Sequence, residues 1–156
     1  MRLLSIFLMT ILSLGFVAGC DNKATAGIDA HIDDLMKTVS NDDVTWERGY
    51  AALTYALSRN ALSVIGELTT LPKPEVYKVL YKYLDDKNRF VVAHIFLGRF
   101  TRTPDKVLVM PYGIKYGDLL VNFSSDGTAS VSPSQIPMLK KKWEGYVLRE
   151  QPKGKP

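Results

Sequence analysis

Apolar residues recur at two different spacings along the chain, and the change of spacing separates helical from strand-like segments. A spacing of three to four residues predicts amphipathic helices, and alternation with polar residues predicts strands. From Ile28 to Val39 the apolar positions keep helical spacing, while acidic residues occupy the other face. This segment is expected to form the first helix of the folded domain.

A second helix is predicted after residue 40. Ser40 and Asp43 have the spacing of a capping box, in which each side chain binds the other residue's backbone N–H. Apolar residues then follow at helical spacing: Trp46, Tyr50, Leu53 and Leu57. Residues 61–68 continue the pattern, either as a kinked extension of this helix or as a short separate helix.

Two further helices are expected at Glu75–Leu84 and Arg89–Phe100, joined by the polar turn 85–88. Pro74 suits the first turn of a helix, where its missing N–H would have no partner anyway. The segment from Arg89 to Phe100 is apolar almost all round, which is typical of a buried, central helix.

Through LDDKNRFVVAHIFL, this pair of helices resembles a HEAT-type helical hairpin. In that family an acidic turn precedes a second helix whose inner face carries valine and alanine. The resemblance covers residues 75–100 and departs from the family in offering a single unit, whereas stacked repeats need about three for stability. It therefore implies a HEAT-like pair inside a compact domain.

After Pro104 the apolar spacing changes to alternation. Strands are predicted at Lys106–Met110, Leu119–Phe123 and Thr128–Val131, with Asp126-Gly127 as a hairpin turn before the third. The glycines of PYGIKYGD are expected in a turn between strands.

A closing helix is predicted from Ser132, Pro133 and Gln135, which suit an N-cap, a first helical position and a capping box. Ile136, Leu139, Trp143 and Tyr146 would form its apolar face. Through SSDGTASVSPSQIPMLKKKWE, the order of elements looks like that of small uncharacterised bacterial proteins, a likeness that implies no activity. The predicted fold class is α+β: a HEAT-like bundle of about five helices, a small antiparallel β-sheet and a closing C-terminal helix.

The first residues have the layout of a secretory signal. Arg2 precedes an apolar run that ends at Ala18, shorter than the roughly 20 residues of a membrane-spanning helix. Val17-Ala18-Gly19-Cys20 resembles the lipobox of bacterial lipoproteins. The resemblance implies that residues 1–19 are removed and that Cys20 carries a diacylglyceryl group. The alternative is a plain signal peptide with a buried or free cysteine.

The lipoprotein interpretation has consequences for location. Residues 20–27 would be a short lipidated tether to the membrane, and Asp21 resembles the signal that retains lipoproteins in the inner membrane of enterobacteria. The expected place is the periplasmic face of the inner membrane if the cell has two membranes. Because Cys20 is the single cysteine, no disulfide or cysteine-ligated zinc site is expected.

The remaining residues 28–150 are expected to form one domain, followed by a disordered tail at 151–156. The full chain has a net charge of +4. Residues 138–156 hold six basic and two acidic residues. This excess suits either anionic lipid headgroups or an ordinary solvated helix face. An exported protein is not expected to bind nucleic acid.

The sequence offers few candidates for catalytic or metal-binding residues. The two histidines, His31 and His94, have no metal-ligand spacing, and no cofactor motif is present. His94 lies in the apolar segment near the acidic turn, where it is either a general base or, as most core histidines are, a packing residue.

The favoured function is therefore a membrane-anchored, non-enzymatic module that binds an envelope protein. The alternative is a cell-envelope enzyme that uses His94 with a carboxylate. Exposed tyrosines anchor interfaces, and clustered lysines steer association or contact lipid, although ordinary packing accounts for the tyrosines as well. The candidate partner contacts are Tyr77, Tyr81, Tyr112, Tyr116, Lys140, Lys141 and Lys142.

Overall fold

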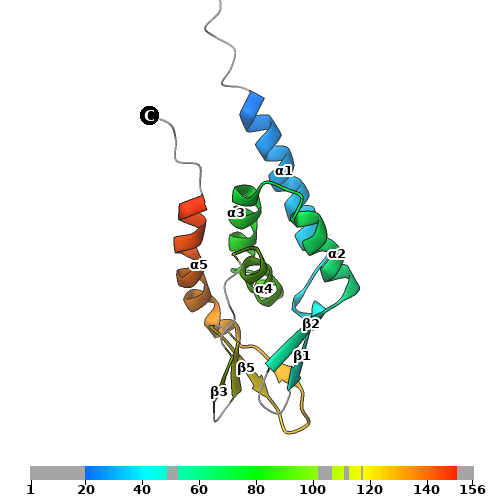
Figure 1. Cartoon of the computed structure of the whole chain (residues 1–156), viewed down its shortest axis with the longest axis vertical. Coiled ribbons are helices and arrows are strands. Elements are labelled where there is room, and N and C mark those ends of the chain that lie inside the picture. The colour runs from blue at the N-terminus through cyan, green and yellow to red at the C-terminus, as the bar shows by residue number, and fades with distance from the viewer. Residues whose placement is uncertain (1–19, 49–52, 102–106, 111–112, 117, 151–156) are drawn as a thin grey trace, which may run out of the picture.

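The computed structural model describes residues 20–48, 53–101, 107–110, 113–116 and 118–150. It has an α+β fold, which confirms the predicted class. Helices form one part of an elongated molecule and the strands lie at the other end (Figure 1). The α-helices are α1 (Cys20–Lys37), α2 (Arg59–Leu68), α3 (Lys73–Tyr83), α4 (Phe90–Thr101) and α5 (Ile136–Glu150).

The strands form two antiparallel sheets. One is a hairpin, and the other is a four-stranded meander in the order β3-β4-β5-β6. Short 3₁₀ turns, η1 (Asn41–Asp43) and η2 (Pro133–Gln135), precede β1 and α5. The strands are β1 (Val44–Arg48), β2 (Leu53–Leu57), β3 (Val107–Met110), β4 (Gly113–Tyr116), β5 (Leu119–Phe123) and β6 (Ala129–Ser130).

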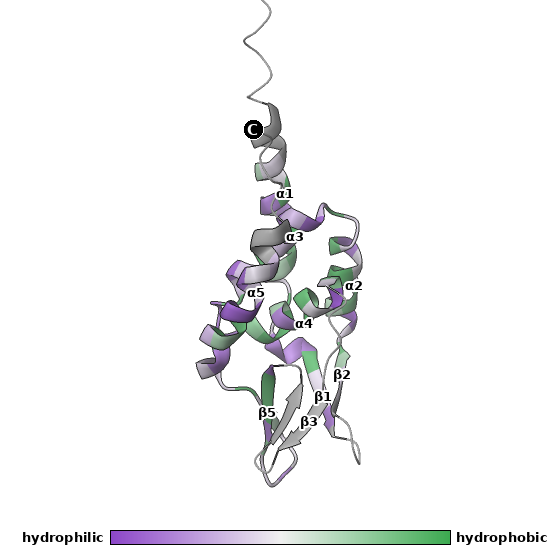
Figure 2. Cartoon of the chain, turned by 60° about the vertical axis from the view of Figure 1, so that its left-hand side comes forward, coloured by the Kyte–Doolittle hydropathy of each residue, from purple (hydrophilic) through white to green (hydrophobic). Residues whose placement is uncertain are grey.

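Helix α4 is the centre of the core, as its composition predicts. Residues 90–97 are all buried, and α2, α3 and α5 surround the helix (Figure 2). Phe96 and Leu97 have no exposed surface, and Trp143 of α5 packs into the same core. The two helices predicted at residues 75–84 and 89–100 exist as α3 and α4.

The predicted helix after residue 40 is wrong for the part of it that the structure describes. That segment forms the hairpin β1-β2, in which Trp46 pairs with Tyr55 and Val44 with Leu57. The two aromatic rings pack edge to face, with their centroids 5.9 Å apart. Cross-strand aromatic and β-branched pairs stabilise sheets, and α2 is consequently a separate helix.

The capping box itself is confirmed, but it opens a different element. Asp43 accepts the Ser40 backbone N–H at 2.8 Å, and the Ser40 side chain caps the 3₁₀ turn η1. Asp43 also accepts the Ser58 hydroxyl at 2.5 Å, and Ser58 in turn caps α2. A single carboxylate thus ties the start of β1 to the end of β2.

The second sheet contains one strand more than predicted. Residues 113–116 form β4, whereas the sequence predicts a turn there. The predicted Asp-Gly turn is confirmed: Gly127 has a φ of 86°, a conformation that glycine adopts without steric cost. The Asp126 carboxylate accepts the Thr128 backbone N–H at 2.9 Å, which closes this turn.

The closing helix begins as predicted, except for the role of Gln135. Ser132 caps η2, and Pro133 occupies its first turn. Gln135 does not complete a capping box. Its side-chain oxygen accepts the Leu120 backbone N–H at 2.7 Å and its amide donates to the Leu120 carbonyl at 2.9 Å. This pair of bonds joins the start of α5 to the edge of β5.

The first helix begins at Cys20, eight residues before the predicted start, so residues 20–27 are helical where a short tether is predicted. Alanine at positions 24 and 26 favours this extension, because alanine is the best helix former. In the part of the chain that the structure describes, no helix combines the length and apolar character needed to cross a membrane. The start of α1 and the end of α5 lie at the same end of the molecule, opposite the sheets (Figure 1).

Candidate functional site

His94 is a core residue that hydrogen-bonds to Trp143. Its exposed fraction is 2%, and Trp143 Nε1 donates to His94 Nδ1 at 2.9 Å. The indole N–H can only donate, so Nδ1 carries no proton and the proton of the neutral imidazole is on Nε2. The imidazole and indole rings pack edge to face, with their centroids 5.6 Å apart.

The electrostatics of His94 do not suit a general base. Burial, together with the positive charge of Lys142, lowers its pKa from an ordinary 6.5 to about 3. Asp118 acts in the opposite direction with a smaller effect. The imidazole has little exposed surface and lines neither the pocket at the sheet end nor the recess between α2 and α4. A general base must come within hydrogen-bond reach of the proton that it abstracts. The burial and the lowered pKa of His94 therefore do not favour the alternative in which it acts as a base.

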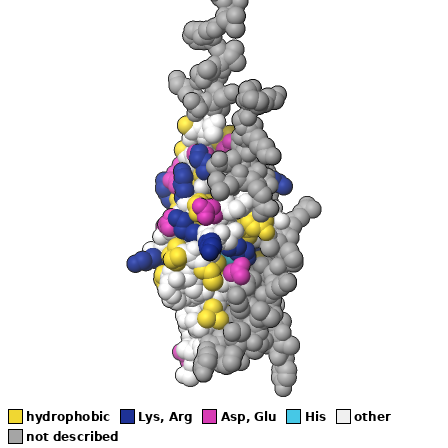
Figure 3. All heavy atoms as spheres, turned by 90° about the vertical axis from the view of Figure 1, so that its left-hand side faces the viewer, with side chains coloured by type: hydrophobic (Ala, Val, Ile, Leu, Met, Phe, Trp, Pro, Cys, Tyr) yellow, Lys and Arg dark blue, Asp and Glu magenta, His cyan; other side chains and the backbone are white. Residues whose placement is uncertain are grey.

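The lysines of α5 are engaged by acids of the same chain. Lys140 lies 2.5 Å from Asp85, and Lys142 lies 3.0 Å from Asp118. The hydrogen bond to Asp85 raises the pKa of Lys140. Figure 3 shows basic and acidic side chains side by side on this face. Two of the three lysines predicted as partner contacts are therefore paired with acidic residues of the same chain, whereas Lys141 is exposed.

The tyrosines predicted as partner contacts lie in different environments. Tyr77 is buried, with 4% of its surface exposed, and packs edge to face on Phe100; it is therefore removed from the candidate contacts. Tyr81 is half-buried beneath Lys140, whose Nζ lies 5.3 Å from the ring centroid. Tyr112 lies outside the described residues, as does the side chain of Tyr116.

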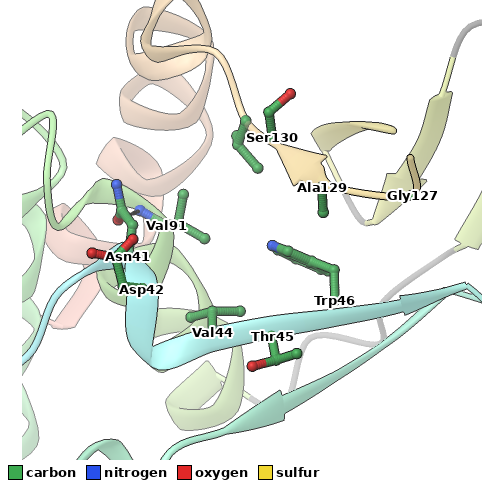
Figure 4. Close-up of a pocket in the computed structure, with 10 residues that line it drawn as sticks. Asn41, Asp42, Val44, Thr45, Trp46, Val91, Gly127, Ala129 and Ser130 are labelled. Atoms are coloured by element: carbon green, nitrogen blue, oxygen red, sulfur yellow. Dashed lines mark hydrogen bonds between the residues drawn. The ribbon is translucent and has the colours of Figure 1, made fainter. Parts of the chain in front are cut away.

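A pocket of about 540 Å³ opens at the sheet end of the molecule. Residues of η1 and β1 line one side, and residues of the β5–β6 turn and β6 line the other (Figure 4). The Trp46 ring projects from β1 toward β6, while Thr45 points to the opposite side of the strand. Val121 of β5 packs against Trp46 and Val131, which fixes this wall. The volume lies within the range of about 300–1,000 Å³ that is typical of small-molecule sites.

Two polar residues of the pocket have distinct roles. Asn41 is structural: its side-chain oxygen accepts the Val91 N–H at 2.9 Å, and its amide donates to the Lys87 carbonyl at 2.8 Å. It thus satisfies a donor in the first turn of α4. Asp42 is exposed, and its carboxylate bonds to no described residue. It is the ionisable residue of the described lining, so this wall carries a negative charge.

The sequence does not predict this pocket. The pocket forms between β1, which belongs to a hairpin that was expected to be helical, and β6, which lies far from β1 in the chain. The available signal was the strand-forming run Val44-Thr45-Trp46. Among the described residues, no group of three or more histidine, cysteine or acidic side chains is placed to hold a metal ion. Comparisons with protein-family models, curated proteins and solved structures find no match to this chain.

Proposed function

We propose that this protein is a lipid-anchored, non-enzymatic binding module of the bacterial cell envelope, and that the pocket at its sheet end receives the partner. The anchor part of the proposal depends on Val17-Ala18-Gly19-Cys20 and on the apolar run before it. Asp21 supports retention at the periplasmic face of the inner membrane in a cell with two membranes.

The observation that carries the binding proposal is the position of the pocket relative to Cys20. Helix α1 has 18 residues and a length of about 27 Å at the usual rise. It starts at the end of the molecule opposite the sheets (Figure 1). A lipid on Cys20 would therefore leave the pocket directed away from the bilayer, accessible to a partner in the envelope.

The character of the pocket supports binding in preference to catalysis. Its described lining combines an aromatic ring and several aliphatic side chains with four polar residues, of which Asp42 alone is ionisable; the other three are Asn41, Thr45 and Ser130. Catalysis requires convergent polar groups, such as a nucleophile within hydrogen-bond reach of a base. Binding requires mainly apolar contact area with a few polar groups that fix orientation.

Site-specific photo-crosslinking in the native envelope tests the proposal. A photoreactive residue at Ser130, which lines the pocket, should capture a defined product, whereas one at the exposed Glu144 of α5 should not. Asp42→Arg reverses the charge of the pocket and should abolish the product without changing the thermal midpoint. Glu47→Arg makes the same charge change on an exposed residue outside the pocket lining and should leave the product intact. Equal products from Ser130 and Glu144 would reject the proposal.

A further inference from the structure

A second recess lies between α2 and the end of α4, and it is apolar. One side is formed by α2 and the residue directly after it, and the other side by α4. Together the six lining residues are called the α2–α4 groove: Leu62, Ile65, Gly66, Thr69, Arg99 and Phe100. Its volume is about 210 Å³. Leu62 has 48% of its surface exposed and is one of two large apolar residues so exposed in the described chain.

The base of the α2–α4 groove is rigid. Ile65 is buried, and Phe100 packs edge to face on the buried Tyr77 with ring centroids 6.2 Å apart. Both side chains are continuous with the main core. A ligand in the groove would therefore meet a preformed apolar surface, which lowers the ordering cost of binding.

Arg99 places a positive charge in a defined position at the rim of this groove. Its Nε donates to the Tyr55 hydroxyl at 3.1 Å, and its guanidinium carbon lies 5.6 Å from the Tyr55 ring centroid. No described residue provides a carboxylate to Arg99, in contrast to Arg89, which lies 2.6 Å from Asp86. Within the described residues, the two terminal nitrogens of Arg99 have no carboxylate partner, and a guanidinium binds a carboxylate through two parallel hydrogen bonds.

Gly66 keeps the groove open. It occupies an interior position of α2, where glycine stabilises a helix less than alanine does. A Cβ at this position would meet no atom within 4 Å. Core packing therefore does not require glycine here, and a larger side chain would extend into the free space of the groove that Gly66 lines.

We propose that the α2–α4 groove binds a peptide segment of a partner protein in which a bulky apolar side chain lies next to a carboxylate. The apolar side chain fills the groove and the carboxylate binds Arg99. The volume is below the range of about 300–1,000 Å³ that is typical of sites for drug-sized molecules, and it suits an anchoring side chain. The charge of Arg99 selects an acidic segment. This inference rests on the proposed binding function, but it depends on neither the lipid anchor nor the pocket at the sheet end.

Fluorescence anisotropy of the full chain in lipid nanodiscs tests the inference, with empty nanodiscs as the blank. The probe is a fluorescein-labelled octapeptide that alternates leucine and glutamate, and its matched control alternates leucine and lysine. The glutamate peptide should bind and the lysine peptide should not. Arg99→Gln should weaken binding about tenfold or more, since a hydrogen bond to a charged group is lost. Lys87→Gln removes one exposed positive charge elsewhere and should bind like the wild type.

Substitutions at Gly66 separate groove binding from simple charge attraction. Gly66→Leu should fill the groove and abolish binding while the thermal midpoint is maintained, because leucine favours a helix more than glycine does. Gly66→Ala should raise the midpoint and retain binding. Undiminished binding by Gly66→Leu, equal effects of Arg99→Gln and Lys87→Gln, or no binding by the wild type would overturn the inference.

Two further outcomes would assign the groove to another occupant. Laurate binding that is lost in Gly66→Leu, without peptide binding, would identify an acyl chain. Self-association that is lost in the same variant would identify a second copy. Either result would overturn the peptide assignment. A retained Ser130 crosslink in the envelope would then show that the proposed binding function stands while this inference fails.

Discussion

The buried, neutral state of His94 makes the stability of the fold depend on pH. Its pKa is lowered to about 3 in the folded chain, from an ordinary value of 6.5 that the unfolded chain restores. Below pH 6.5 the unfolded chain therefore binds a proton that the folded chain does not. The stabilising contribution is complete above pH 6.5 and is lost as the pH falls toward 3.

The size of this effect on the free energy of unfolding depends on the interval between the pKa values of His94 in the folded and the unfolded chain. The slope approaches about 1.4 kcal/mol per pH unit well inside this interval, so acidification from pH 7 to pH 5 should lower the free energy of unfolding by about 2 kcal/mol. Carboxyl groups have ordinary pKa values near 4, so their protonation changes the stability mainly below this pH range.

Urea unfolding between pH 7 and 5 measures this effect. The wild type should lose about 2 kcal/mol across the range, whereas His94→Gln should lose little, since its amide does not titrate. Leu97→Ala provides the control, because it destabilises the core but keeps the imidazole and should retain the wild-type slope. The same loss in His94→Gln as in the wild type would refute the assignment of the pH dependence to His94.

Other perturbations test the anchor, the core and the pocket wall. Cys20→Ala should leave an unprocessed precursor that incorporates no palmitate analogue in metabolic labelling; normal maturation would contradict lipidation. Asp21→Ser should move the protein toward the outer membrane of a two-membrane cell in sucrose-gradient fractionation, and an unchanged distribution would argue against sorting by Asp21. Leu97→Ala removes a side chain with no exposed surface and should cost about 2–5 kcal/mol in urea unfolding; an unchanged midpoint would contradict its burial. Asn41→Ala leaves the Val91 N–H and the Lys87 carbonyl without their partner and should cost about 1–3 kcal/mol, whereas a neutral result would show that water replaces the amide.

Features that depend on the residues of a single element could be predicted from the sequence. The apolar composition of α4 indicated its burial, and the Asp126-Gly127 pair indicated a turn. The Ser40–Asp43 capping box was also found, but such a box specifies only how a helical turn begins. Whether the chain then continues as a helix or turns into a strand depends on partners distant in sequence.

The hairpin β1-β2 shows why the remaining elements were not predicted. Its apolar residues have helical spacing in sequence, yet Trp46 and Tyr55 lie opposite each other in the sheet. Helix and strand patterns coincide over such short segments. The α2–α4 groove is formed by residues that are distant in sequence, at positions 62–69 and 99–100, and its rim depends on the bond between Arg99 and Tyr55 of β2. Neither spacing nor composition contains that information.

The hydrogen bonds of α1, and of the residues directly after it, with Tyr83 and Arg89 determine which parts of the molecule would resist a pulling force applied at the N-terminus. Arg89 binds the carbonyls of Met36 at 3.2 Å, Lys37 at 3.3 Å and Val39 at 3.1 Å, and the Tyr83 hydroxyl donates to the Asp33 carboxylate at 2.8 Å. Tension along α1 would be borne by these bonds and by the α3–α4 connection, which lies within the helical layer. The β1-β2 hairpin would carry little of that load. If Cys20 carries the proposed lipid, drag on the molecule would then leave the geometry of the sheet-end pocket unchanged until α1 separates from α3.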